Sequence, residues 1–243
     1  MMNMAILLSG GIGSRISTDI PKQYIRVRGR MIVTYALRTL LEAPQIDGVY
    51  IVAELQWQQK LLDDAREAGL IPDKVKGFAL PGANRQCSVL NGLHKIYEDQ
   101  NEAALQRGLE STSDSVLIHD AARPMLSRRL LDECYRALEG HDGVMPVLPM
   151  KDTVYYSQDG TRVDRLLDRS SIFAGQAPEL YRMDLYYKAN RSLWPDKILA
   201  INGSTEPAIM AGMDIVMIRG EESNYKITTD TDLKRFMEAA DTI

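Results

Sequence analysis

The sequence predicts an α/β fold built on a mostly parallel sheet with helices on both faces. Two observations support this prediction. Short apolar runs alternate with segments of helical period along residues 4–148, and a glycine-rich turn follows the first apolar run directly. With 243 residues, of which 45% are hydrophobic, the chain is long enough to bury a substantial core. We therefore expect residues 1–243 to form a single domain.

The expected elements follow in order. Apolar runs predict buried strands at Met4–Leu8, Val49–Ala53, Val75–Leu80, Ser115–His119 and Gly143–Leu148. Apolar residues at helical spacing predict helices at Ile32–Leu41, Gln56–Ala68, Ser88–Tyr97 and Leu130–Leu138. Thr228, Thr229 and Asp230 resemble the cap of a last helix that extends to Ala240. The polar segment 101–114 is expected to be a surface helix or loop.

Residues 151–175 interrupt this alternation and predict a β-arm inserted into the domain. Thr153-Val-Tyr-Tyr and Arg162-Val-Asp-Arg-Leu-Leu are typical of two strands, joined by a turn at Gln158-Asp-Gly160 with no helix between them. A lone hairpin is marginally stable in water. We therefore expect the arm to project from the domain and to mediate a homodimer.

Composition excludes several classes of protein. A net charge of −4 argues against a nucleic-acid-binding protein, which carries a strong basic patch. No apolar run approaches the roughly 18 residues of a membrane span, and no secretory leader is recognisable. Cys87 and Cys134 lie far apart, so the sequence suggests neither a zinc site nor a disulfide framework. These features predict a cytoplasmic protein.

The first loop is typical of a polyphosphate site. Glycines at positions 10, 11 and 13 allow bare N–H groups to approach an anion, and Arg15 and Lys22 add two positive charges. A dinucleotide-binding loop would need a third glycine where Ile16 stands, and an acidic residue about 20 positions later. The candidate acidic residue, Glu54, lies 43 residues after Gly11, and no P-loop signature occurs.

Five blocks in this chain together resemble the 2-C-methyl-D-erythritol 4-phosphate cytidylyltransferases and their sister family, the ribitol-5-phosphate cytidylyltransferases. The blocks are Ser9-Gly-Gly-Ile-Gly-Ser-Arg15 with Pro21-Lys22-Gln23, Gly82-Ala-Asn-Arg85-Gln-Cys-Ser88-Val89, His119-Asp120-Ala-Ala-Arg123-Pro124, Gln176-Ala177-Pro178-Glu179 and Asn224-Tyr-Lys226-Ile-Thr228. The resemblance implies a Rossmann-like nucleotidyltransferase sheet. It also implies CMP transfer from CTP to a polyol phosphate, with Mg²⁺ as cofactor and pyrophosphate as the second product.

The resemblance also implies a role for individual residues. The catalytic cations are Arg15, Lys22 and Lys226. The nucleotide-binding residues are Ser9, Gly10, Gly11, Gly13, Gly82, Ala83, Arg85, Ser88, Asp120 and Ala121. The acceptor-binding residues are Thr153, Arg169 and Thr205, and Asp120 is the metal ligand.

Elementary chemistry allows a second interpretation for four of these residues. Asp120, at the carboxyl end of a strand, suits a Mg²⁺ ligand but could instead cap the next helix. Ser88 could read the base, cap its helix, or do both. Arg85 could contact the nucleotide or form a structural ion pair. Lys226 would either face an anion or extend into solvent.

The expected acceptor site departs from the family pattern. Ala177 replaces a threonine, Glu206 and Ser223 replace aspartates, and Glu179 replaces a glutamine. We expect methylerythritol phosphate, a precursor in isoprenoid biosynthesis, as the acceptor, with ribitol phosphate as the alternative.

Two other classes of function remain to be compared with this one. A glycosyltransferase would need an Asp-x-Asp metal motif, for which Asp230-Thr-Asp232 is the match. A non-catalytic scaffold would lose Arg15 or Lys22, and both are present.

Overall fold

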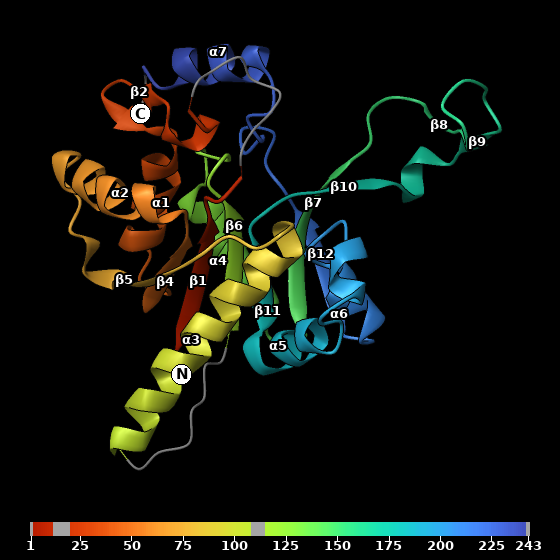
Figure 1. The fold of residues 1–243 in the computed structure, drawn as a ribbon. Helices are drawn as coiled ribbons and strands as arrows, with labels where there is room; N and C mark the ends of the chain where they lie inside the picture. Colours follow the sequence, from red (N-terminus) through yellow and green to blue (C-terminus); the bar gives the residue numbers. More distant parts are fainter. Residues whose placement is uncertain (1, 12–19, 108–114, 242–243) are drawn as a thin grey trace.

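The computed structural model describes residues 2–11, 20–107 and 115–241 (Figure 1). In this part of the chain the main sheet has eight strands in the order β10-β7-β11-β6-β1-β4-β5, and β12 pairs with β7. The strands are β1 (Asn3–Leu8), β4 (Gly48–Val52), β5 (Val75–Ala79), β6 (Ser115–Asp120), β7 (Gly143–Pro149), β10 (Phe173–Gly175), β11 (Glu179–Arg182) and β12 (Ile215–Arg219). β1 pairs in parallel with both β4 and β6, whereas β11 and β10 run antiparallel to their neighbours. The mostly parallel sheet is therefore confirmed.

Helices cover both faces because the strand residues alternate between two cores. In β1, Ala5 and Leu7 belong to the core beneath α1, α2 and α4, whereas Met4 and Ile6 belong to the core beneath α3, α5 and α6. The helices are α1 (Ile32–Glu42), α2 (Leu55–Glu67), α3 (Arg85–Arg107), α4 (Arg128–Ala137), α5 (Met183–Arg191), α6 (Glu206–Met210) and α7 (Asp230–Ala239). Short 3₁₀ turns are η1 (Lys22–Tyr24), η2 (Pro72–Lys74), η3 (Arg169–Ser171) and η4 (Lys197–Ala200).

The predicted elements are present, with ends that differ by a few residues. The largest difference is α3, which starts three residues before the expected Ser88 and continues to Arg107. Part of the polar segment 101–114 is therefore helix, and residues 108–114 lie outside the described part of the chain. The cap of α7 is confirmed, because Thr229 and Asp232 form a capping box.

The β-arm projects from the sheet as a separate two-stranded ribbon (Figure 1). Its strands β8 (Val154–Tyr156) and β9 (Arg165–Leu167) are antiparallel, as predicted. The predicted end of the arm at residue 175 is wrong, because β10 pairs with β7 and so belongs to the main sheet. Tyr155 and Leu166 are 57% and 63% exposed, so the arm carries apolar side chains that the described residues leave largely uncovered.

A second small hairpin lies beside the first loop. Its strands are β2 (Arg26–Val27) and β3 (Arg30–Met31), and its turn uses positive φ angles at Arg28 and Gly29. The buried carboxylate of Asp64, in α2, accepts hydrogen bonds from the Met31 N–H and the Thr34 hydroxyl, which fixes this hairpin against the domain.

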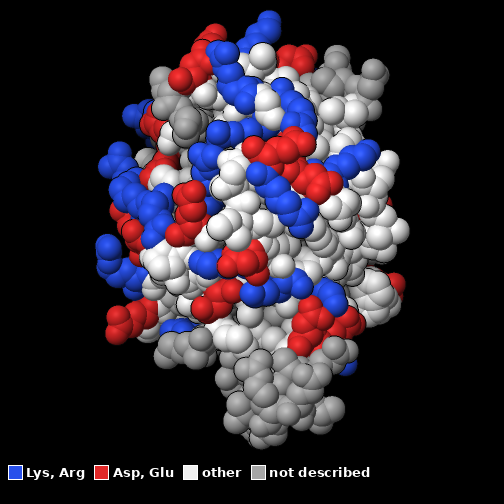
Figure 2. Space-filling view, turned by 90° about the vertical axis from the view of Figure 1, so that its left-hand side faces the viewer, with Lys and Arg blue, Asp and Glu red and all other residues white. Residues whose placement is uncertain are grey.

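The surface seen in Figure 2 carries interspersed positive and negative side chains. Within the described ranges, no helix combines the length and the apolar character that crossing a bilayer requires.

Candidate active site

A cavity of about 690 Å³ opens where β1, β4 and β6 end. Open α/β sheets bind ligands at this edge, because the loops after adjacent parallel strands meet there. Ten of the predicted site residues line the cavity: Ser9, Gly10, Gly11, Lys22, Gly82, Ala83, Arg85, Ser88, Asp120 and Lys226. Ala121 is buried behind the wall, where its N–H donates to the Leu8 carbonyl. Gly13 and Arg15 lie outside the described residues.

The start of the glycine turn is held by side chains from η1. The Gln23 amide donates to the carbonyl oxygens of Ser9 (2.7 Å) and Gly11 (2.8 Å). The Tyr24 hydroxyl also donates to the Ser9 carbonyl, at 2.8 Å. A Cβ atom at Gly10 would lie only 2.4 Å from the ring of Pro81, so this position requires glycine for the two loops to pack together. The cavity therefore has fixed walls at its glycine side.

The second wall is the turn that begins α3. Asn84 rather than Ser88 caps this helix, since its side-chain oxygen accepts from the Cys87 N–H at 2.7 Å. The capping interpretation of Ser88 was thus wrong. Its hydroxyl instead accepts from the Gly82 N–H (3.0 Å) and donates to the Asn84 carbonyl (2.9 Å). Ser88 ties the Gly82 turn to the first turn of the helix.

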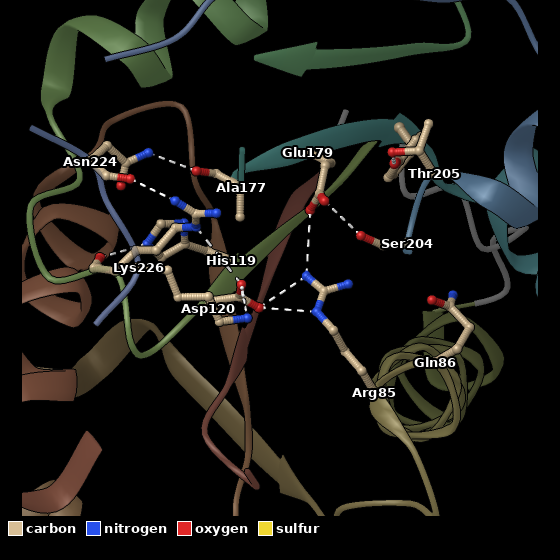
Figure 3. A network of polar contacts seen from close by, with 12 residues as sticks. Arg85, Gln86, His119, Asp120, Ala177, Glu179, Ser204, Thr205, Asn224 and Lys226 are labelled. Carbon is tan, nitrogen blue, oxygen red and sulfur yellow. Dashed lines mark hydrogen bonds and ion pairs between the residues drawn. The ribbon is translucent and has the colours of Figure 1, made fainter. Parts of the chain in front are cut away.

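A cluster of charges occupies the floor of the cavity (Figure 3). Asp120 accepts from Arg85 Nε and Nη2, at 3.1 and 2.9 Å, and from Lys226 Nζ at 2.9 Å. Arg123 Nε lies 3.8 Å from the same carboxylate. Burial alone would raise the pKa of Asp120, but the charges of Arg85, Lys226 and Arg123 outweigh it and hold that pKa well below its ordinary value. Asp120 is therefore ionised.

These contacts decide between the two interpretations given for each of Asp120, Arg85 and Lys226. Asp120 does not cap the next helix, because Ser127 caps α4 by accepting from the Leu130 N–H. Arg85 does form an ion pair, and it also lines the cavity. Lys226 faces an anion, namely Asp120, with 36% of its side chain exposed.

Glu179 adds a second buried carboxylate to the cluster, which the sequence analysis did not assign to the site. Its Oε2 lies 3.7 Å from Arg85 Nη2, and its Oε1 accepts from the Ser204 hydroxyl at 2.7 Å. Burial raises the pKa of Glu179, and the nearby charge of Arg85 only partly opposes this. Arg85 Nη2 thus contacts the carboxylates of both Asp120 and Glu179 (Figure 3). The sequence signal that could have assigned Glu179 to the site is that a glutamate stands where the family has a glutamine.

Hydrogen bonds behind the cluster position Lys226. The Arg123 guanidinium donates to the Asn224 carbonyl at 2.7 Å, and the Asn224 amide donates to the Ala177 carbonyl at 2.7 Å. Burial lowers the pKa of His119 to about 4, so this imidazole is neutral and donates from Nε2 to the Arg123 carbonyl at 3.0 Å. These residues belong to the sequence blocks. The hydrogen bonds that connect Arg123, Asn224 and Ala177 join different blocks, so the sequence alone does not reveal them.

The three predicted acceptor residues do not line this cavity. Thr153 and Arg169 lie together on the arm, where they border a separate cavity of about 540 Å³. Arg169 is exposed and donates to the Lys151 carbonyl at 2.9 Å. Thr205 is buried at the start of α6, with its hydroxyl 2.9 Å from that of Tyr181. Within one chain, the structure brings Thr153 and Arg169 together at a cavity separate from the one that Lys22 and Asp120 line.

The donor set suits a metal that binds mainly through substrate. Within the described residues, no group of three or more histidine, cysteine or acidic side chains is placed to hold an ion. The acids that line the cavity are Asp120 and Glu54. An ionised carboxylate fits one ligand position of Mg²⁺, which in nucleotide sites takes its remaining ligands from phosphates and water. The Asp-x-Asp motif of a glycosyltransferase is not supported, because Asp232 serves the capping box of α7.

Comparison with known proteins agrees with this geometry. Residues 3–239 match the family model described as 2-C-methyl-D-erythritol 4-phosphate cytidylyltransferase. A protein of that name from Rubrobacter xylanophilus is 33% identical over 95% of this chain and 91% of its own length. A bifunctional IspD/IspF enzyme from Paramagnetospirillum magneticum is also 33% identical, and this chain spans 55% of it. A ribitol-5-phosphate cytidylyltransferase from Lacticaseibacillus paracasei is 25% identical over 97% of the chain and 96% of its own length.

Solved structures support the fold. The 4-diphosphocytidyl-2C-methyl-D-erythritol synthase of Anaerococcus prevotii matches 100% of this chain and 96% of its own, with a TM-score of 0.77 at 23% identity. The family match covers nearly the whole chain, residues from four of the five blocks line one cavity at the carboxyl edge of the sheet, and Glu179 of the remaining block contacts Arg85 in its wall. This protein belongs to the 2-C-methyl-D-erythritol 4-phosphate cytidylyltransferase family.

Proposed function

We propose that this protein transfers CMP from CTP to 2-C-methyl-D-erythritol 4-phosphate. One observation carries the proposal: a cavity that combines a glycine turn, a base-sized wall at Gly82 and Ser88, and the cations Lys22, Arg85 and Lys226. Such a cavity suits a nucleoside triphosphate. The relatives with the higher identities carry the methylerythritol name, whereas the ribitol enzyme is more distant, which favours methylerythritol phosphate as the acceptor.

The reaction needs no protein nucleophile. A phosphate oxygen of the acceptor attacks the α-phosphorus of CTP and forms a new P–O bond. The bond between the α-phosphorus and its bridging oxygen breaks, and pyrophosphate leaves with the electron pair. The acceptor phosphate is already anionic at neutral pH, so no general base is required. Catalysis then consists of alignment and of stabilising the charge on the phosphoryl oxygens.

We assign that stabilisation to Lys22 and Lys226, together with Arg15 on the grounds of its sequence block. Lys22 precedes Gln23 and Tyr24 in η1, and both of these side chains are bonded to the glycine turn. Lys226 has a flexible side chain, and its ammonium pairs with Asp120 at 2.9 Å. An incoming phosphate would compete for it. Backbone groups at Gly10, Gly11, Gly82 and Ala83 would contact the nucleotide.

Mg²⁺ is the cofactor that we infer, with Asp120 as its protein ligand. The ion would neutralise charge on the triphosphate. Arg85 and Arg123 hold the carboxylate in one orientation in the absence of nucleotide. We place the reaction in the cytoplasm, where both buried cysteines would stay as the free thiols that they are here.

We also infer a homodimer through the arm. Thr153 and Arg169 carry the groups that would bind the acceptor, but they stand away from the nucleotide cavity of their own chain. A second copy that receives the arm would bring these side chains to its own CTP site. The exposed Tyr155 and Leu166 would then be covered.

A substrate panel tests the proposal. CTP, UTP, ATP and GTP are each supplied with methylerythritol phosphate or with ribitol phosphate, and pyrophosphate release is measured. CTP with methylerythritol phosphate should give the highest kcat/KM. A tenfold higher value with ribitol phosphate would overturn the acceptor assignment. No pyrophosphate from CTP with either acceptor would overturn the proposed reaction.

A further inference from the structure

One wall of the nucleotide cavity is an aromatic residue outside all five sequence blocks. Trp57 lies in the first turn of α2 and lines the cavity beside Glu54 and Gln56. The end of β4 brings it there, because α2 begins three residues after that strand.

Both faces of the Trp57 ring are in contact with other side chains. The Tyr24 ring stacks on it with centroids 4.1 Å apart and planes 9° from parallel. The Lys60 ammonium lies 4.8 Å from the indole centroid, and since a stacked ring fills one face, the ammonium takes the other. A cytosine ring cannot stack here without displacing one of them. The indole therefore meets the cavity with its edge.

The partner of Trp57 is bonded to the glycine turn. The Tyr24 hydroxyl donates to the Ser9 carbonyl (2.8 Å) and accepts from the Ser9 hydroxyl (3.0 Å). Tyr24 is only 2% exposed and belongs to the same 3₁₀ turn as Lys22. The orientation of its ring thus sets both the turn that bears Lys22 and the carbonyl where the glycine turn begins.

We propose that Trp57 is a positioning residue for this reaction, which holds Tyr24 by stacking and thereby fixes Lys22 and the glycine turn relative to each other. A stacked aromatic pair is more favourable than the area that it buries alone would give, which restricts the position of a short turn. The inference rests on the proposed function only for its turnover assay.

The first test compares two replacements. Trp57→Leu keeps apolar volume but removes the stack, and we expect it to lower kcat by about tenfold with little change in the KM for the acceptor. Trp57→Phe can still stack and should retain most of the turnover. Leu55→Ala, on the same helical turn and 72% exposed, is the matched control and should behave as wild type. Circular dichroism and the urea midpoint check that each variant is folded.

A double-mutant cycle tests the route through Tyr24. Tyr24→Phe keeps the ring and loses both bonds to Ser9, so it should also lower kcat. If both residues act through one turn, the double variant Trp57→Leu/Tyr24→Phe should cost less than the product of the single effects. Fully multiplicative effects would contradict a shared route.

Fluorescence gives a readout that does not depend on turnover. The chain has two tryptophans, so Trp194→Phe leaves Trp57 as the sole tryptophan, which is excited selectively at wavelengths that tyrosine does not absorb. CTP should change its emission, because its edge lines the cavity. In Trp57→Phe the remaining Trp194 borders a different cavity and should report no change.

Three results would overturn the inference. Wild-type kcat in a folded Trp57→Leu variant is the first. The second is a loss of CTP affinity with kcat intact, which would indicate direct contact with the nucleotide. The third is a lower KM for CTP in Lys60→Ala, which would make the freed indole face a platform for the base. An inactive wild type would contradict the proposed function instead, and the fluorescence test would still apply.

Discussion

Charged side chains in the nucleotide cavity and on the β-arm differ in their burial and in the residues that pair with them. In the cavity, the Asp120 side chain is 10% exposed and has three cationic neighbours in its own chain, Arg85, Arg123 and Lys226. On the arm, Arg169 is exposed and bonded to the Lys151 carbonyl, while Asp168 is bonded within its own turn to Ser170. Arg85, Arg123 and Lys226 surround Asp120 in the cavity, whereas Arg169 and Asp168 are bonded within the arm, and Lys151 at the base of the arm pairs with Glu222.

We propose that this difference reflects which half of the reaction each region serves. A preformed cluster costs no reorganisation when charge develops, so it suits the reacting triphosphate. An arm with exposed apolar residues and few contacts to its domain suits a surface that is completed by a second copy. This division of roles would be refuted if the cavity cations were dispensable for turnover, or if the arm completed the site of its own chain.

The largest expected effect is in the cavity. Lys22→Ala should lower kcat by about 10²-fold or more, as is typical when a group that stabilises transition-state charge is removed. Steady-state pyrophosphate release measures it. Lys188→Ala, on the exposed face of α5, is the control for loss of a lysine elsewhere. Wild-type turnover in the Lys22 variant would contradict the proposal that the cations of the cavity stabilise the transition state.

An intermediate effect is expected from mixing two inactive proteins. If the arm completes the partner's site, a heterodimer of Arg169→Ala and Lys22→Ala chains has one intact site. Random exchange in a two-fold dimer should then restore about a quarter of wild-type activity. Subunit exchange is verified with differently tagged chains. Exchange without recovered activity would show that each site is built within one chain, and the contrast between cavity and arm would lose its functional meaning.

The same contrast explains what could be predicted from the sequence. The strand ends that meet at the cavity were identified because buried parallel strands are continuous apolar runs, as in Ser115–Asp120. The unpredicted strand β11 has only four residues, too few for a period to be recognised. The role of Glu179 depends on a partner in α3, and no local pattern reports a contact between residues so distant in sequence.

The arm shows a different limit. Its strands were predicted from composition and a turn, but its end was misplaced because β10 continues directly from it. In the homodimer that we propose, Thr153 and Arg169 would reach the cavity of the second copy, and no local pattern in the sequence predicts that placement.

The smallest expected effect is a difference in the pH dependence of stability between the two regions. Burial raises the pKa of Glu179 in the folded state above its pKa in the unfolded state. The free energy of unfolding of the wild type therefore falls as the pH rises from the unfolded-state pKa through the folded-state pKa. Glu179→Gln has no such carboxyl group and does not lose this stability. On the arm, hydrogen bonds from Ser170 lower the pKa of Asp168, so wild type gains stability relative to Asp168→Asn as pH rises. Glutamine still accepts the Ser204 hydrogen bond, and the repulsion between its amide and Arg85 is independent of pH. Free energies of unfolding in urea would give the two signs, measured at about pH 4.5 and 7.5 for Glu179, whose pKa is raised, and at about pH 2.5 and 4.5 for Asp168, whose pKa is lowered. We expect the wild-type minus variant difference to fall for Glu179 and to rise slightly for the solvent-screened Asp168. Equal signs would mean that Glu179 is ionised as easily as a surface carboxylate, and that Arg85 fully compensates its burial.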